Sequence, residues 1–475
     1  MTEATTHHVD SSTDAGTSLG GLRRTLKARH VVMISLGGII GAGLFVGSSA
    51  AIAATGPAVV ISYGIAGALV FLVMRMLGEL VVSQSGVSSF TEYTRQPLGN
   101  FAAFLTGWLY AYFWVIVVAF EALVGAQMLT GILGLPVWAI ALLLLVILTG
   151  VNLFSVRGYG EFEFWFASIK VAAVILFILA GLCWLAGIGR VDPAPALSLF
   201  SYDAFVPKGA ASILGAVPAV IFSICGAEIA AIAAAESTEP GRNVSRLAIS
   251  VIFRVLFFYL GSVLIIVSIM SWTDVVPGQS PFVAALDRMQ VPFASEAMNF
   301  IILTAVLSCL NSGIYVTSRI LLGLSLQGDA PRRALRTNSA GVPVGGVLFT
   351  AVAAYALLLI SSLSYEAVFT FLLNASGAIM LLVYFMIAWA QIKSRYAMSP
   401  EARAALPVQM WWFPGLSIAV MLAIAAVLVV MTLSSSTQSQ VYATAVAVAV
   451  VAVAYLLRRA GTPLGGSRET ARAGS

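Results

Sequence analysis

Long apolar stretches separated by short polar connections recur along almost the whole chain. About twelve of them approach or exceed the roughly 20 residues that a helix needs to cross the hydrocarbon core of a bilayer. The longer connections are rich in Pro, Gly or charged residues, and none is long enough for a separate soluble domain. The pattern therefore predicts an all-α integral membrane protein. The expected spans are 30–54, 58–83, 99–130, 136–154, 162–188, 210–235, 246–271, 295–326, 343–362, 366–391, 413–433 and 439–457.

Lys and Arg are divided unevenly between the two sets of connections. If the N-terminus is cytoplasmic, eighteen of the 25 lie on the cytoplasmic side, and only Arg190, Lys208 and Arg288 lie outside. Cytoplasmic loops of membrane proteins carry such an excess. We expect both termini to be cytoplasmic, in a bacterial inner membrane. Residues 1–28 lack the apolar core and cleavage site of a signal peptide and predict a disordered tail.

The composition narrows the class of function. Of the 475 residues, 60% are hydrophobic and 9% are charged, against roughly 25% charged in soluble domains. The net charge of +5 follows from the basic loops and does not indicate nucleic-acid binding. Three scattered cysteines and three histidines near the N-terminus predict no metal site, no cofactor and no Cys–His catalysis. We expect a membrane protein that is not an enzyme; with no selectivity-filter pattern, a channel is also disfavoured.

Two spans contain residues that interrupt helices. Span one has four glycines within seven residues, at positions 37, 38, 41 and 43, each costing roughly 1 kcal/mol relative to Ala inside a helix. Close packing of small residues is one reading, and an unwound segment is the other. Span six places Gly226 and Glu228 near its middle. Glycine interruptions at matching positions of two halves are typical of transporter sites in inverted repeats, which favours the unwound reading.

Two such breaks predict a site for a zwitterion. Free N–H groups around Gly41, Ala42 and Gly43 suit a carboxylate at a helix N-terminus. Carbonyl groups near Ser35 and Ser223 suit an ammonium group. The expected substrate site is completed by Gly37, Gly38, Gly226 and Phe222, of which Phe222 is expected to form a wall or gate.

Several motifs resemble a known family. They are the His30–Ser49 stretch with GGIIGAGLFVGSS, the segment Arg75–Glu79, the segment Tyr159–Trp165, the Gly226–Glu236 motif, Cys309–Ser312 and Gly328–Pro331. Together they resemble the amino acid–polyamine–organocation superfamily, and within it the bacterial amino acid transporter family, over residues 25–458. The resemblance implies a LeuT-like fold: inverted five-helix repeats at 29–190 and 191–392, with broken helices 1 and 6. Two further helices would occupy 393–458, before a cytoplasmic tail at 459–475.

Within the family, the SSAAIA run, the YGEFEFW stretch and Asn374–Ala378 most resemble the permeases for GABA (4-aminobutyrate). The resemblance implies proton-driven import of GABA by alternating access, with no partner besides the substrate and the bilayer, in a monomer or weak dimer. An importer or exchanger of an aromatic residue, proline, asparagine or lysine stays open. A nutrient sensor that does not transport is less favoured.

Ionisable residues inside spans are expensive and tend to be functional. Lys170 has no near neighbour of opposite charge in the sequence; by resemblance it takes part in proton coupling, donates to carbonyls near Gly37, or does both. Glu121 is either a substrate-amine contact and proton carrier or a polar clasp between helices. By resemblance, Glu228 is expected to lie behind the second break and to hold backbone N–H groups. Arg75 and Glu79 are spaced to pair with each other on one helix.

Overall fold

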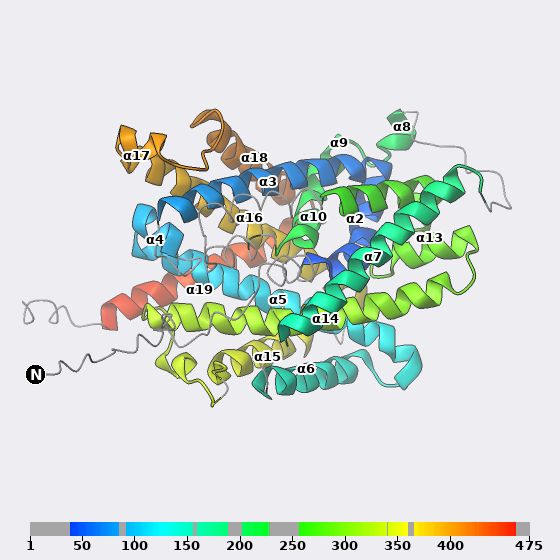
Figure 1. Cartoon of the computed structure of the whole chain (residues 1–475), viewed down its shortest axis with the longest axis horizontal. Coiled ribbons are helices and arrows are strands. Elements are labelled where there is room, and N and C mark those ends of the chain that lie inside the picture. Colours follow the sequence, from blue (N-terminus) through cyan, green and yellow to red (C-terminus); the bar gives the residue numbers. More distant parts are fainter. Residues whose placement is uncertain are drawn as a thin grey trace, which may run out of the picture.

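The computed structural model describes residues 39–84, 92–154, 159–188, 202–226, 228, 256–339, 341–359 and 365–461. These residues form helices and turns, with one isolated bridge between Thr337 and Pro343 as the sole β-type pairing described. The longer helices run roughly along the long axis of the bundle (Figure 1). The all-α fold predicted from hydropathy is confirmed.

The described part of the chain contains eight helical segments that are long and apolar enough to span a membrane, and three shorter apolar helices. The first segment, Gly43–Ser83, includes two expected spans, because Gly56, with φ +74°, turns the chain between them. Each of the twelve expected spans thus has a helical counterpart. They are η1 (Gly43–Gly47) with α2 (Ser48–Thr55), α3 (Val59–Ser83), α5 (Asn100–Leu133), α6 (Val137–Phe154), α7 (Tyr159–Leu185), α9 (Ala210–Gly215) with α10 (Val217–Ile224), Leu256–Ile269, α14 (Ala294–Leu326), α15 (Val344–Leu359), α16 (Tyr365–Ala397), α18 (Gly415–Leu433) and α19 (Gln438–Gly461).

Short helices in the connections were not predicted by hydropathy. The principal ones are α4 (Glu92–Leu98), α8 (Tyr202–Phe205), α13 (Pro281–Met289) and α17 (Pro400–Ala404). The helix α13 begins where Ser280 accepts a hydrogen bond from the amide of Val283, with Pro281 in the first turn, a favourable helix start. The helices α4 and α17 lie at one end of the bundle, together with the end of α19, and α8 and α13 lie at the other (Figure 1).

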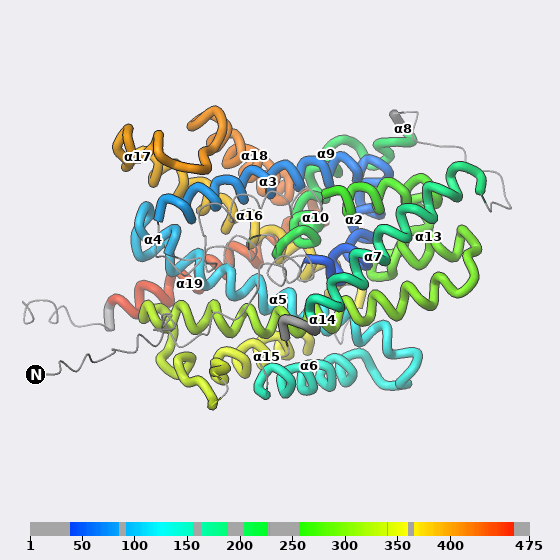
Figure 2. Tube along the Cα trace, viewed as in Figure 1, coloured from blue at the N-terminus to red at the C-terminus, as the bar shows by residue number. Residues whose placement is uncertain are grey.

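The helix α5 organises the core. Its 34 residues span about 51 Å at 1.5 Å per residue, and it packs against α14, α16, α6, α15, α4 and α19. The short helix α10 packs against α3, α16, α2 and η1. The tube in Figure 2 shows α5 crossing the middle of the bundle, with α6 and α15 along one side and α3 along the other. The two predicted breaks therefore face the most buried helices of the bundle.

Candidate functional site

The backbone is irregular between Ile39 and Gly47, at the first expected break. The amide of Gly41 donates to the carbonyl of Ile39 at 3.1 Å, and the π-helical turn η1 follows. A Cβ on Gly41 would lie 2.5 Å from Oε1 of Glu121 and 2.9 Å from Sγ of Cys309. A larger residue at position 41 would have to displace the side chains of Glu121 and Cys309. Ser35, Gly37 and Gly38, also expected at this break, lie outside the described residues.

The carboxylate of Glu121 caps the first break. Its two oxygens lie 3.1 and 3.2 Å from the amide nitrogen of Ala42, and the side chain is buried. Hydrogen bonds from an amide to an ionised carboxylate are roughly twice as strong as neutral ones. The sequence predicts that a substrate carboxylate meets this amide. In the structure, a side chain 79 positions away in the sequence accepts its hydrogen bond instead.

Lys170 lies in a buried polar cluster with Ser308 and Glu163. Its Nζ donates to Oγ of Ser308 at 3.0 Å and lies 3.8 Å from Oε1 of Glu163. The hydroxyl of Ser308 is 2.7 and 2.9 Å from the oxygens of Glu163. The expectation that Lys170 lacks an oppositely charged neighbour in the sequence is wrong: Glu163 is two helical turns earlier on α7, on the same face. Glu163 and Ser308 were missed as site residues, although this spacing could have indicated Glu163.

The second expected break follows α10. The helix ends at Ile224, Cys225 turns to ψ 149°, and Gly226 adopts φ +109°, a conformation that favours glycine. The carboxylate of Glu228 accepts hydrogen bonds from the amide of Gly226 at 3.1 and 3.2 Å. The carboxylate of Glu228 thus lies behind the break and accepts from its turned backbone.

Two tyrosines complete the environment of Glu228. The hydroxyl of Tyr110 on α5 donates to Oε1 at 3.1 Å, and that of Tyr384 on α16 donates to Oε2 at 3.4 Å. All three side chains are buried. Neither tyrosine was predicted from the sequence, because each is more than a hundred residues from Glu228 and no local spacing connects them.

A serine connects the two breaks directly. The hydroxyl of Ser223 donates to the carbonyl of Gly43 at 2.7 Å, and a Cβ on Gly43 would lie 2.9 Å from Cα of Ser223. Glycine at position 43 is therefore required for the two interrupted helices to touch. The carbonyl of Gly43 is a hydrogen-bond acceptor that faces α10. An ammonium group needs an acceptor of this kind.

Phe222 belongs to a buried aromatic layer beside the breaks. Its ring lies 4.7 Å, centroid to centroid, from Phe120 in an edge-on arrangement, and Phe120 lies 5.0 Å from Phe369. The carbonyl of Phe222 accepts from the amide of Cys225 at 3.3 Å. The ring therefore lies in an aromatic layer beside the breaks, and its role as a wall or gate for the substrate stays a prediction.

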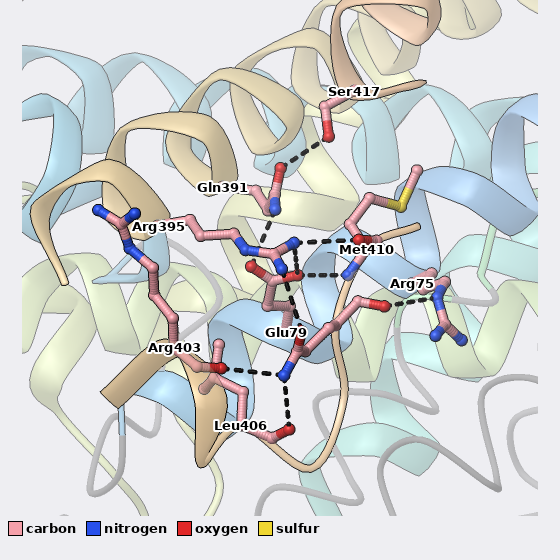
Figure 3. Close-up of polar contacts among 9 residues, drawn as sticks. Arg75, Glu79, Gln391, Arg395, Arg403, Leu406, Met410 and Ser417 are labelled. Carbon is pink, nitrogen blue, oxygen red and sulfur yellow. Dashed lines mark hydrogen bonds and ion pairs between the residues drawn. The ribbon is translucent and has the colours of Figure 1, made fainter. Parts of the chain in front are cut away.

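A second polar cluster lies near the end of the bundle that carries α4 and α17. Glu79 on α3 accepts from Gln391 and Arg395 on α16 and from the backbone amide of Met410 (Figure 3). Its ion pair with Arg395 measures 3.4 Å. Arg75, the partner that the sequence indicates, instead donates to the carbonyl of Gln409. The i,i+4 spacing of Arg75 and Glu79 does not decide the partner of Glu79, because α16 brings Arg395 closer to it.

Comparisons with known proteins show the family of the chain. The family model described as "Amino acid permease" matches residues 30–462. The chain is 43% identical to the gamma-aminobutyric acid permease of Bacillus subtilis, over 86% of this chain and 87% of that one. It is 44% identical to a probable GABA permease of Pseudomonas aeruginosa, over 84% and 85%. It is 36% identical to the aromatic amino acid transport protein AroP of Escherichia coli O6:H1, over 84% and 92%.

A solved structure shows the same fold at low sequence identity. The chain aligns with the crystal structure of a mutant of the Eremococcus coleocola manganese transporter with a TM-score of 0.56 and 14% identity, covering 91% of this chain and 94% of that one. This similarity shows the class of fold, which is LeuT-like, with two interrupted helices. The family match makes the assignment more specific: the chain belongs to the amino acid permease family, and it is a transporter rather than an enzyme.

Proposed function

We propose that this permease imports GABA, or an amino acid of similar length, by proton symport. The observation that supports GABA as the substrate is the order of sequence identity. Relatives named for GABA are 40–44% identical to this chain, whereas the relatives named for aromatic amino acids are 36% identical. Import of another amino acid and exchange are the alternatives on the same fold.

The geometry of the breaks supports a zwitterionic substrate. The amide of Ala42 suits a carboxylate, because it already donates to the carboxylate of Glu121. Carbonyl groups around Ser35, Phe222 and Ser223 are the proposed acceptors for the ammonium group. GABA separates its charges by three methylene groups, so its acceptors must lie farther apart than those for an α-amino acid.

Glu121 offers a physical route to proton coupling. Two carboxylates cannot both accept from the amide of Ala42, so the substrate must displace Glu121. An ionised Glu121 holds the amide more strongly than a protonated one. Protonation of Glu121 therefore favours substrate binding, and by linkage substrate binding favours protonation. Lys170 and Glu163 form an ion pair beside Ser308. Their charges are proposed to balance that of Glu121, so that the exchange of carboxylates at Ala42 is reversible.

The proposed orientation places both termini in the cytoplasm of a bacterial cell, with no cofactor besides the proton gradient. The eighteen-to-three division of Lys and Arg supports this orientation. The helices α4 and α17 and the end of α19 share one end of the bundle (Figure 1), which the proposal assigns to the cytoplasmic side. Alternating access would then carry substrate from the α8 and α13 end to the α4 and α17 end.

The direct test is uptake into proteoliposomes. Labelled GABA is supplied with an inward proton gradient, and unlabelled GABA, proline, phenylalanine, asparagine and lysine are tested as competitors. We expect accumulation that a protonophore abolishes, that needs no sodium and that only GABA blocks. Competition by another amino acid alone would reassign the substrate. Fast counterflow without gradient-driven accumulation would make the protein an exchanger and remove Glu121 and Lys170 from proton coupling, while binding without any transport would indicate a sensor.

A further inference from the structure

A pocket of about 670 Å³ opens near the end of the bundle that carries α17, apart from the two breaks. It lies between α3, the end of α16 and the connection from α17 to α18. Three arginines line it, Arg75, Arg395 and Arg403, together with Trp411 and Trp412. Among the described residues, no acidic side chain lines it. A pocket with this lining attracts an anion.

Among the described residues, two of the three arginines form no ion pair with a carboxylate. Arg395 pairs with Glu79 and also donates to the side chain of Gln409 and the carbonyl of Met410. Arg75 uses only Nε, which donates to the carbonyl of Gln409 at 3.0 Å. Figure 3 shows its guanidinium group apart from the carboxylate of Glu79. Within the described part of the chain, the two terminal nitrogens of Arg75 accordingly remain available as donors.

Arg403 supplies the second available charge. Its Nη2 donates to the carbonyl of Tyr396 at 2.9 Å, while Nε is buried and has no partner among the described residues. Glu401, on the same short helix, does not line the pocket. Guanidinium groups bind phosphate through two parallel N–H donors, a geometry that lysine does not offer.

The aromatic residues indicate where the anion comes from. The exposed fractions of Trp411 and Trp412 are 49% and 86%, and the guanidinium carbon of Arg75 lies 3.8 Å from the ring centre of Trp411. Both tryptophans lie just before α18 begins at Gly415, where a membrane span starts. Exposed tryptophans at span ends lie at the level of lipid headgroups. The pocket is therefore reached from the headgroup layer rather than from bulk water alone.

We propose that this pocket binds the phosphate of an anionic phospholipid, with Arg75 and Arg403 as the donors. Basic pockets between membrane helices bind such headgroups. The acyl chains would lie along the exposed apolar face of α18, which includes Ile418 and Leu422. The occupied pocket would tie α3, which packs against the interrupted helix α10, to α16 and α17.

The test uses the full chain purified in detergent, with phosphatidylglycerol and phosphatidylcholine of identical acyl chains, read by native mass spectrometry. We expect the wild type to retain one phosphatidylglycerol with at least tenfold preference over phosphatidylcholine. Each arginine contributes about 1 kcal/mol, so the double variant Arg75→Gln/Arg403→Gln should bind about 30-fold more weakly. Arg332→Gln, an exposed arginine of the 3-10 turn η5 (Arg332–Leu335) that does not line the pocket, is the matched control and should bind as the wild type does.

Three outcomes would overturn the proposal. Equal binding of the two lipids would show no anion site, and unchanged binding in the double variant would place the lipid elsewhere. Displacement of the lipid by millimolar inorganic phosphate would show a site for a free anion. If the double variant does not fold, the single Arg403→Gln variant, on the peripheral helix α17, answers the same question with an expected loss of about fivefold.

Discussion

The two interrupted helices have the same kind of cap, but the residues around the two caps differ. At each break a buried glutamate accepts a hydrogen bond from a backbone amide, Glu121 from Ala42 and Glu228 from Gly226. Glu228 is also held by two tyrosine hydroxyls. Glu121 instead faces the region of Cys309 and Lys170, beside the ion pair of Lys170 with Glu163.

This difference separates a permanent cap from an exchangeable one. The carboxylate of Glu228 has donors on both oxygens from three elements, so it cannot leave without exposing several buried polar groups. The carboxylate of Glu121 accepts from the amide of Ala42 and from the side chain of Cys309, near the positive charge of Lys170. In the proposed mechanism a substrate carboxylate replaces it at Ala42. The first break is thus suited to change during transport, and the second to stay constant.

The largest expected effect comes from removing the positive charge beside the first break. Lys170→Met leaves Glu163 as a buried, uncompensated charge, which costs about 3–5 kcal/mol. We expect a large fall in thermal stability and no gradient-driven accumulation of GABA. Thermal unfolding in detergent and proteoliposome uptake measure the two effects.

The double variant Lys170→Met/Glu163→Gln separates those effects, because it removes both charges. Its stability should recover most of the loss, whereas accumulation should stay absent. Recovery of both would mean that the ion pair is purely structural and that Lys170 has no part in coupling.

The next effect in size concerns Glu121. Glu121→Gln keeps an acceptor for the amide of Ala42 but removes the proton, so we expect stability within about 1 kcal/mol of the wild type. Accumulation should fall at least tenfold, counterflow should persist, and the rate should no longer depend on pH. A raised KM with unchanged pH dependence would instead assign Glu121 to the substrate amine, and unchanged transport would leave it a clasp between helices.

Glu228→Gln should have a smaller effect on transport than Glu121→Gln, and a larger one on stability. The amide side chain places a donor where Glu228 now only accepts, against the amide of Gly226, and an unsatisfied buried donor costs about 1–3 kcal/mol. We expect a lower unfolding temperature and slower uptake, with the pH profile of the wild type. A shifted pH profile would contradict the assignment of Glu228 as a permanent cap.

Hydropathy and glycine positions were sufficient to predict the spans and both breaks, because membrane helices need about 20 apolar residues and unwound backbone needs glycine. The contacts of the site were not predictable in the same way. Glu121 and Ala42 are 79 positions apart, and Glu79 and Arg395 are 316 apart, so only helix packing decides these pairs. Glu163 and Lys170 are the exception, since helical periodicity alone places them on one face.

The smallest expected effect tests whether the two breaks act together. Ser223→Ala removes the hydroxyl that joins α10 to the carbonyl of Gly43, and one neutral hydrogen bond contributes about 1 kcal/mol. If the substrate closes this contact, KM should rise about fivefold with little change in kcat. Ser262→Ala is the matched control. Ser262 is also buried, but among the described residues it bonds to carbonyls of its own helix alone, so its variant should keep the KM of the wild type. An equal change in both variants would show a general loss of packing, and no change in Ser223→Ala would mean that the breaks bind substrate independently.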